Sequence, residues 1–403
     1  MKLSRPSQLV LASITGLLVA SLFTACQLVT VDYVYLAGSG GTGAGSAGQI
    51  QAFAVDSETG ALRTGVPPIS SGGNTPVALA VSPDYANLYV GNSDNDTVVH
   101  FSLASDGTMT KKDSVTLAGP PVALAVNQAN NYLYVAYGSK TANLAEYSIS
   151  SGTIGSLTAT EALTIPGFST DTVLSTDVAV LPNNAAVYVT AYDQSSYNPG
   201  GTVTSSASPG WVFGFSVSSG GGLAPAVASP YQTGIKPSAV AADPTSRFVY
   251  VTDYASNALV GYGVLSGSTL NFLISGPFKT GSEPSSVIVD PRAKYIYVSN
   301  ALDSSVSAYA IDLSTGIPSA VVNVTGSQIN ATDTQPVSIA VDPALGRFVY
   351  TANFLGNSIS GFQLNPDTGA LKPSQATPYP AQSHPTALVI VPHGNHSLET
   401  TSP

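Results

Sequence analysis

The feature that most constrains this chain is a phrase that recurs along it: a proline, an alternating apolar strand, a turn, then a strand ending in Tyr-Val or a similar pair. The phrase reads PVALAVSPDYANLYVGN from Pro76 to Asn92 and returns as PSSVIVDPRAKYIYVSN from Pro284. Further copies begin at Pro121, Ser175, Pro237 and Pro336, and the copy at Ser175, STDVAVLPNNAAVYVTA, is the weakest. Repetition at this period indicates one repeat fold.

A tyrosine in the second strand of the phrase counts the repeats. It occurs at Tyr35, Tyr89, Tyr134, Tyr188, Tyr250, Tyr297 and Tyr350. The spacing, between 45 and 62 residues, suits a four-stranded blade and is too long for leucine-rich or ankyrin repeats. The sequence therefore predicts an all-β, seven-bladed β-propeller.

The two ends of the chain predict how the ring closes. The first tyrosine strand has no first strand before it, whereas the segment HPTALVIVP, from His384 to Pro392, resembles a first strand and has no tyrosine strand after it. We expect this last segment to complete the first blade, which leaves no open sheet edge. The predicted propeller spans residues 32–392, and residues 393–403 are a polar tail in which His393 and His396 have no specific role.

The first thirty residues resemble an export signal. Lys2 and Arg5 precede an apolar stretch from Leu9 to Phe23, which is short for a membrane-spanning helix. The string ending at Cys26 resembles a bacterial lipobox, with Phe23 where leucine is usual. We expect residues 1–25 to be a signal peptide, Cys26 to carry lipid and residues 26–31 to be a tether. The alternative is a cysteine lying by chance in a discarded signal.

Location and partners follow from this N-terminus and from charge. Gln27 resembles the signal that sorts lipoproteins to the outer membrane, so we expect an exported bacterial envelope protein. Removing Lys2 and Arg5 from the 13 basic residues leaves 11 against 23 acidic residues, which disfavours nucleic acid and anionic membrane surfaces as partners. Membrane contact is expected through the lipid alone, and a closed ring is expected to be a monomer.

The repeats resemble YVTN-type repeats, most closely in VYVTDYASNALVGY from Val249 to Tyr262. Their arrangement is similar to the seven-bladed lactonase superfamily, which includes 6-phosphogluconolactonase-like proteins. That family's pattern places Arg-His just after the first-strand proline and Glu after the tyrosine strand. Here those places hold small residues, as at Val77-Ala78 and Ser285-Ser286, so the resemblance implies the fold more strongly than the activity.

Ligands of propellers usually bind where the loops meet the central channel. The polar and aromatic candidates on that face are Asn92, Asp94, Asp96, Lys140, Tyr192, Asp193, Lys236, Tyr254, Asn300, Asp303 and Asn353. Lactone hydrolysis needs a general base and a group that stabilises an oxyanion. His384, Glu283 and Asp253 are the catalytic candidates, against the alternative that they form a solvated rim.

Two further features of the sequence have part of the pattern of a functional site. Asp94-Asn95-Asp96 has the spacing of a calcium loop but no glycine at the sixth place, so we expect a tight turn, and no metal or cofactor. The insertion from Asp193 to Gly210 ends beside Trp211, the only tryptophan. Trp211 either shapes a pocket or packs between blades.

Three functions remain open from the sequence. The first is a tethered module that binds a carbohydrate, a peptide or an envelope protein at the channel face. The second is a lactone hydrolase with an unusual site, so whether the chain is an enzyme stays undecided. The third is an envelope scaffold with no small ligand.

Overall fold

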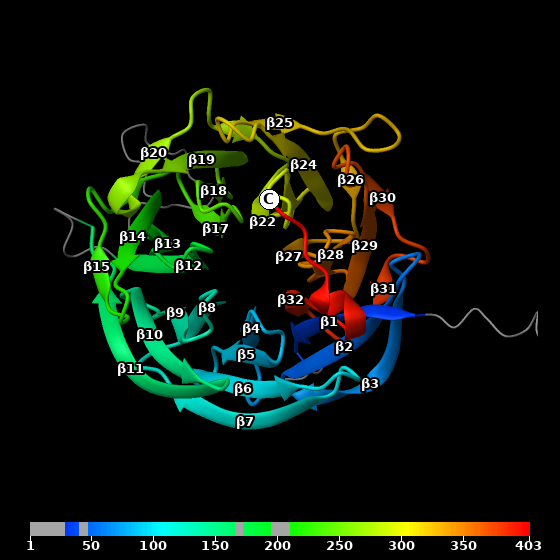
Figure 1. The fold of residues 1–403 in the computed structure, drawn as a ribbon, viewed down its shortest axis with the longest axis horizontal. Helices are drawn as coiled ribbons and strands as arrows, with labels where there is room; N and C mark the ends of the chain where they lie inside the picture. The colour runs from blue at the N-terminus through cyan, green and yellow to red at the C-terminus, as the bar shows by residue number, and fades with distance from the viewer. Residues whose placement is uncertain (1–28, 40–46, 166–171, 195–209) are drawn as a thin grey trace, which may run out of the picture.

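The computed structural model describes residues 29–39, 47–165, 172–194 and 210–403. Within these residues, seven antiparallel sheets form blades around a central channel, as Figure 1 shows looking down the ring. We number the blades by their tyrosines, from Tyr35 in blade 1 to Tyr350 in blade 7. The predicted seven-bladed propeller is confirmed.

The inner strand of each blade lines the channel and begins, in six of the described blades, with a proline. These strands are β4 (Pro76–Val81), β8 (Pro121–Val126), β12 (Val173–Val180), β17 (Pro237–Ala242), β22 (Pro284–Val289), β27 (Pro336–Val341) and β32 (Pro385–Pro392). A proline donates no ladder hydrogen bond, so it suits the first position of a strand. The small residues that follow let the seven strands approach one another around the channel.

The second and third strands form the body of each blade. The tyrosine strands are β1 (Thr30–Gly38), β5 (Asn87–Asn92), β9 (Tyr132–Tyr137), β13 (Ala186–Asp193), β18 (Phe248–Asp253), β23 (Tyr295–Asn300) and β28 (Phe348–Asn353). The third strands are β2 (Gln49–Asp56), β6 (Thr97–Leu103), β10 (Asn143–Ser150), β14 (Gly210–Val217), β19 (Ala258–Val264), β24 (Ser305–Ile311) and β29 (Ser358–Leu364).

The outer edge is continuous in blades 1 to 3 and broken in blades 4 to 7. The continuous strands are β3 (Leu62–Ser70), β7 (Met109–Thr116) and β11 (Thr153–Ala162). The broken edges are β15 (Leu223–Pro225) with β16 (Tyr231–Gln232), β20 (Leu270–Phe272) with β21 (Phe278–Lys279), β25 (Pro318–Ala320) with β26 (Asn330–Ala331), and β30 (Leu371–Pro373) with β31 (Tyr379–Pro380). Two short 3-10 turns complete the elements: η1 (Ser266–Ser268) and η2 (Gly394–Leu398).

The hydrophobic core lies between blades. Each tyrosine strand has neighbours on both faces, so β5, β18, β23 and β28 are buried at every residue instead of alternating. Buried apolar residues gather into clusters that each join two adjacent blades. In the cluster between blades 7 and 1, for example, Ile359 and Tyr350 pack with Phe53 and Leu36. The stability of the ring therefore depends on every blade having both of its neighbours.

The last strand closes the ring as predicted. β32 pairs antiparallel with β1, with Tyr35 opposite Val389 and Val34 opposite Ile390. The segments from the two ends of the propeller therefore share one sheet, which Figure 1 shows as red β32 beside blue β1. After β32, η2 folds against this closure instead of extending into solvent, and His396 within it is 4% exposed.

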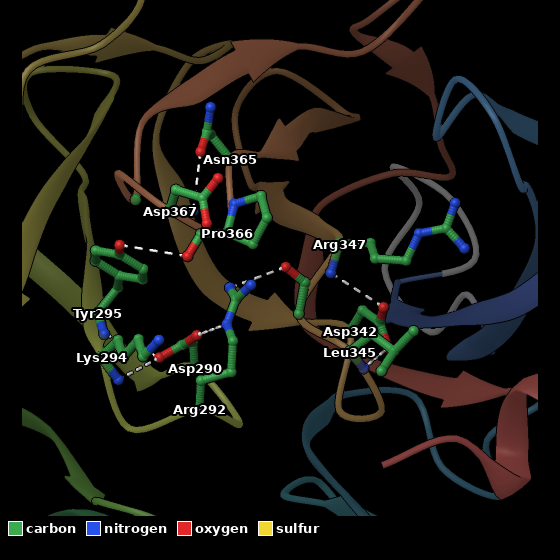
Figure 2. A network of polar contacts seen from close by, with 12 residues as sticks. Asp290, Arg292, Lys294, Tyr295, Asp342, Leu345, Arg347, Asn365, Pro366 and Asp367 are labelled. Carbon is green, nitrogen blue, oxygen red and sulfur yellow. Dashed lines mark hydrogen bonds and ion pairs between the residues drawn. The ribbon is translucent and has the colours of Figure 1, made fainter. Parts of the chain in front are cut away.

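Aspartates and arginines hold the turns between the first and second strands. These turns lie at the end of the channel opposite the starts of the inner strands. Asp290 accepts hydrogen bonds from the backbone of Lys294 and Tyr295 and pairs with Arg292 at 2.6 Å (Figure 2). Arg292 also donates to the carbonyl of Gly346, which links blade 6 to blade 7. The arginines on this face therefore have structural partners.

Candidate functional site

A cavity of about 580 Å³ opens at the channel mouth, on the face where the inner strands begin. Its lining comes mainly from blades 3, 4 and 5: Val122, Gly138, Ser139, Leu174, Ser175, Thr176, Tyr192, Lys236, Pro237, Ser238, Tyr254, Ser285 and Val337. We call this the mouth cavity. Its mixture of apolar walls with a few polar groups is typical of a small-molecule site, and its volume falls in the usual range of roughly 300 to 1,000 Å³.

Lys236 stands in the mouth cavity between two aromatic rings. Its Nζ lies 5.5 Å from the ring centre of Tyr192 and 4.7 Å from that of Tyr254. Burial lowers the pKa of Lys236, and the Glu283 carboxylate acts in the opposite direction. The ammonium is thus held in a partly desolvated, aromatic setting.

Asp253 fixes the loop that presents Lys236. Its carboxylate accepts hydrogen bonds from the backbone amides of Ile235 and Lys236, at 2.5 and 2.9 Å. Tyr254 in turn donates its backbone amide to the carbonyl of Lys236 at 2.9 Å. Asp253 is fully buried and forms part of the support for the site, not of its surface.

The mouth cavity continues into the channel. A second cavity of about 180 Å³ shares Val122, Thr176, Ser238, Ser285 and Val337 with the first. Its other lining residues are Val77, Ala78, Leu79, Ala123, Leu124, Asp177, Ala239, Ser286, Ser338, Thr386, Ala387 and Leu388. Among these described lining residues, Asp177 carries the one ionisable side chain.

Asp177 is held in place by backbone amides. One carboxylate oxygen accepts a hydrogen bond from Val240 at 2.9 Å, and the other accepts one from Val178 at 2.8 Å. Burial raises the pKa of the Asp177 carboxyl to about 7, although both hydrogen bonds act to lower it. Asp177 lines this cavity, and the residue as a whole is partly exposed.

Sequence reasoning overlooked Asp177, although the repeat contained the signal. Read in register, STDVAVLP aligns with PVALAVSP, which places Asp177 where the other repeats have Ala78, Ala123, Ala239 and other small residues. This is also the place at which the family pattern has the histidine of Arg-His.

Three predicted binding residues, Tyr192, Lys236 and Tyr254, come together in the mouth cavity. The catalytic candidates do not meet there as a set. His384 lies at the start of β32, where its ring packs against Phe354 at 4.8 Å and its backbone amide donates to Asn357. Glu283 lies at the start of β22 and influences Lys236 through its charge.

The buried amides among the candidates brace their own blades. Asn92 donates to the carbonyl of Ser71 at 3.0 Å, and Asn300 and Asn353 donate to Ser307 and Ser360. Asp193 is likewise buried. Asn92 thus holds the loop that leads into β4, whereas Asn300 and Asn353 tie the second strands of their blades to the third strands.

The remaining candidates lie in turns or in the core. Asp94 accepts from the amides of Asn74 and Thr75, and Asp303 accepts from Ser282. Asp96 has a φ of 55°, a left-handed turn conformation, and Lys140 is exposed. Trp211 packs against the apolar cluster between blades 3 and 4, while residues 195–209 of the insertion lie outside the described residues.

Comparison with known proteins identifies the family. A family model described as "Lactonase, 7-bladed beta-propeller" matches residues 34–189 and 109–397. The chain belongs to this lactonase family. No curated protein matches it by sequence. Within the described residues, no helix has the length and apolar character needed to cross a membrane.

Solved structures share the lactonase propeller. A periplasmic gluconolactonase, PpgL, of Pseudomonas aeruginosa is 18% identical with a TM-score of 0.70, covering 90% of this chain and 99% of that chain. A putative 6-phosphogluconolactonase of Bacteroides uniformis is 17% identical with a TM-score of 0.70, and the match covers 90% of this chain and 100% of that chain. At these identities the likeness shows the fold alone, so the activity of this lactonase-family chain has to be argued from its own site.

Proposed function

We propose that this chain hydrolyses small, uncharged lactones in the mouth cavity. The observation that carries the proposal is Asp177, a single carboxylate with a pKa of about 7 in the channel floor, beneath a cavity that contains Lys236. A general base is most effective when its pKa lies near the working pH. Membership of the lactonase family supports the same reaction class.

Each group has a defined part in the proposed reaction. The Asp177 carboxylate takes a proton from water, whose oxygen attacks the lactone carbonyl carbon. The Lys236 ammonium stabilises the oxyanion that forms on the carbonyl oxygen. The bond from that carbon to the ring oxygen then breaks, and the ring oxygen takes the proton back from Asp177 as the hydroxy acid forms.

The lining of the cavity favours an uncharged sugar lactone over a phosphorylated one. The rings of Tyr192 and Tyr254 offer flat surfaces for a sugar ring, and the serines and Thr176 offer hydroxyl groups. Phosphate is usually bound by arginine. In the described structure, Arg247 and Arg347 donate to backbone carbonyls and Arg292 pairs with Asp290, all on the opposite face.

Hydrolysis of glucono-δ-lactone above its spontaneous rate, measured in a pH-stat, tests the proposal. We expect Asp177→Asn to lose about 10² to 10⁴-fold in kcat. The matched control is Asp303→Asn, which removes an exposed carboxylate on the same face outside the mouth cavity and should keep full activity. Equal rates for wild type and Asp177→Asn on every neutral lactone tried would overturn the assignment.

A binding module for a carbohydrate, peptide or envelope protein is the second candidate. It is favoured by the small residues at the places of the family's Arg-His and by the buried, bonded amides that follow the tyrosine strands. An inert protein that retains glycans through Tyr192 and Tyr254 would support this reading. We expect the His384→Ala variant to hydrolyse lactones as fast as the wild type. A variant that lost turnover would instead show that His384 is a catalytic residue.

We also propose that the propeller is exported and tethered to the bacterial envelope, in the outer membrane, through lipid on Cys26. The residues that carry this proposal, 1–28, lie outside the described residues. Support comes from their export-signal pattern and from the periplasmic location in the name of the Pseudomonas aeruginosa relative.

A further inference from the structure

A second cluster of ionisable side chains lies at the ring closure, on the face opposite the mouth cavity. Asp32 comes from β1, Asp342 from the turn between β27 and β28, and His396 from η2. All three are buried, and their ligating atoms lie within 4.8 Å of one another. The three segments are distant in sequence and meet only through the fold.

Asp32 is the least satisfied member of the cluster. Its side chain is fully buried, and neither carboxylate oxygen has a hydrogen-bond partner within the described residues. One of them, Oδ1, lies 3.3 Å from Nε2 of His396. A buried carboxylate without hydrogen bonds is costly unless a cation compensates it.

The distances around His396 are at the long end of the range for a hydrogen bond and also suit a shared metal ion. Nε2 of His396 is 3.2 Å from both oxygens of Asp342 and 3.3 Å from Asp32. A charge-assisted hydrogen bond would be about 2.7 to 2.9 Å long and aimed at one oxygen. Ligands held at about 2.0 to 2.1 Å in a tetrahedron stand roughly 3.3 Å apart, and Nε2 of His396 stands at such a distance from an oxygen of each aspartate.

Neighbouring groups orient both ligands. The other ring nitrogen of His396, Nδ1, pairs with the Glu399 carboxylate, an arrangement that fixes the tautomer of metal-binding histidines. Asp342 accepts hydrogen bonds from the backbone amides of Ala344, at 2.9 Å, and of Arg347, at 3.1 Å. Figure 2 shows the hydrogen bond between Arg347 and Asp342. The repeat-equivalent Asp290 has Arg292 as its counter-ion, whereas the Arg347 guanidinium donates to the carbonyl of Ser57.

We propose that Asp32, Asp342 and His396 bind a structural divalent transition-metal ion, Zn²⁺ being the best match. One imidazole with carboxylates favours zinc over calcium, which prefers oxygen ligands alone. Because all three ligands are buried, the site is closed and its role is structural. The ion would fasten η2 and β1 to blade 7, beside the ring closure where β1 pairs with the distant strand β32.

Metal content and calorimetry of the purified chain, prepared without a polyhistidine tag, test the site. We expect about one Zn²⁺ per chain, removal by a strong chelator, and rebinding that raises the unfolding temperature. His396→Ala should weaken zinc binding by at least about 100-fold, and Glu399→Gln by about 10 to 100-fold. His393→Ala is the matched control, because that ring packs edge-on against Tyr33 outside the cluster and should leave zinc affinity unchanged.

The Asp32→Asn variant separates a loss of zinc binding from a failure to fold. It keeps the shape of the side chain and removes a buried charge, so the metal-free variant should stay folded while losing zinc affinity by about 100-fold. Zinc binding that is equal in wild type and Asp32→Asn would overturn the proposal. The proposal would also be overturned if the metal-free wild type neither binds Zn²⁺ nor becomes more stable in its presence. In that case the cluster would be a protonated histidine between two aspartates.

Discussion

The hydroxyl of Tyr350 in blade 7 donates a 2.7 Å hydrogen bond to the carbonyl of Gly60 in blade 1, although the residues are 290 positions apart. Tyr35, Tyr89, Tyr188, Tyr250 and Tyr297 make the same bond to the third-to-fourth strand turn of the next blade. In blade 3 it is Tyr132, not Tyr134, whose hydroxyl donates the corresponding hydrogen bond, to the carbonyl of Gly220 in blade 4. Six of the seven tyrosines that count the blades therefore also join them.

Replacing Tyr350 with phenylalanine should destabilise the ring at its closure. The buried Gly60 carbonyl would lose its 2.7 Å donor and keep only the longer 3.4 Å hydrogen bond from the Tyr379 hydroxyl, which should cost about 1 kcal/mol. Tyr132→Phe is the matched control, because its hydrogen bond is exposed and water can replace it. Urea unfolding of both variants measures the difference, and an equal loss in the two would contradict a special role for the buried bond.

Gly60 should tolerate alanine less well than Gly326 does. Both have positive φ, 67° and 82°, so both variants carry backbone strain. Only at Gly60 would the new Cβ lie 2.5 Å from a ring atom of Phe348, whereas Gly326 faces open space. We expect Gly60→Ala to lose about 1 to 3 kcal/mol more stability. Thermal unfolding of the two variants measures the difference. Equal falls in their unfolding temperatures would contradict the prediction.

Asp177 should make the stability of the fold depend on pH. Its carboxyl has a pKa of about 7 in the folded chain against 3.8 unfolded, so between these values the folded state binds the extra proton. The free energy of unfolding should therefore fall as pH rises from about 4 through 7. Asp177→Asn should remove that part of the slope. Denaturant titrations at pH 5 and 8.5 compare the two, and parallel curves would count against the raised pKa.

Cys26→Ser should abolish lipid attachment and release the propeller in soluble form. The reason is chemical, since in the proposed anchor the Cys26 thiol is the group that would carry the lipid. Palmitate labelling and membrane fractionation of cells expressing each form provide the measurement, with sensitivity to globomycin as the control for signal-peptide processing. Labelling that persists in the serine variant would refute the anchor.

The fold could be predicted from the sequence because its signals are local and repeated. Seven tyrosines at a steady spacing fix the blade number, and the unpartnered strand from His384 to Pro392 fixes the closure, which β32 confirms. The hydrogen bonds of those tyrosines could not be predicted, because each acceptor carbonyl lies in the next blade and carries no side-chain signature.

The candidate site was only partly predictable for the same reason. Lys236, Tyr192 and Tyr254 were found because they lie at loop positions that the repeat marks as facing the channel. Asp253 and Asn92 lie at such positions too, yet they turn inward to bind backbone groups, a choice that depends on the neighbouring loop. His396 was assigned to a polar tail because its partners lie far from it in the sequence, Asp342 54 residues earlier and Asp32 in the first strand.

Asp177 has one more consequence, which concerns symmetry. Blades of equal shape around an axis would offer a ligand several equivalent orientations, and none of them would be preferred. Asp177 in blade 4 and Lys236 in blade 5 place opposite charges on one side of that axis. A polar molecule entering the channel mouth therefore meets a directed electric field and can settle in a single pose.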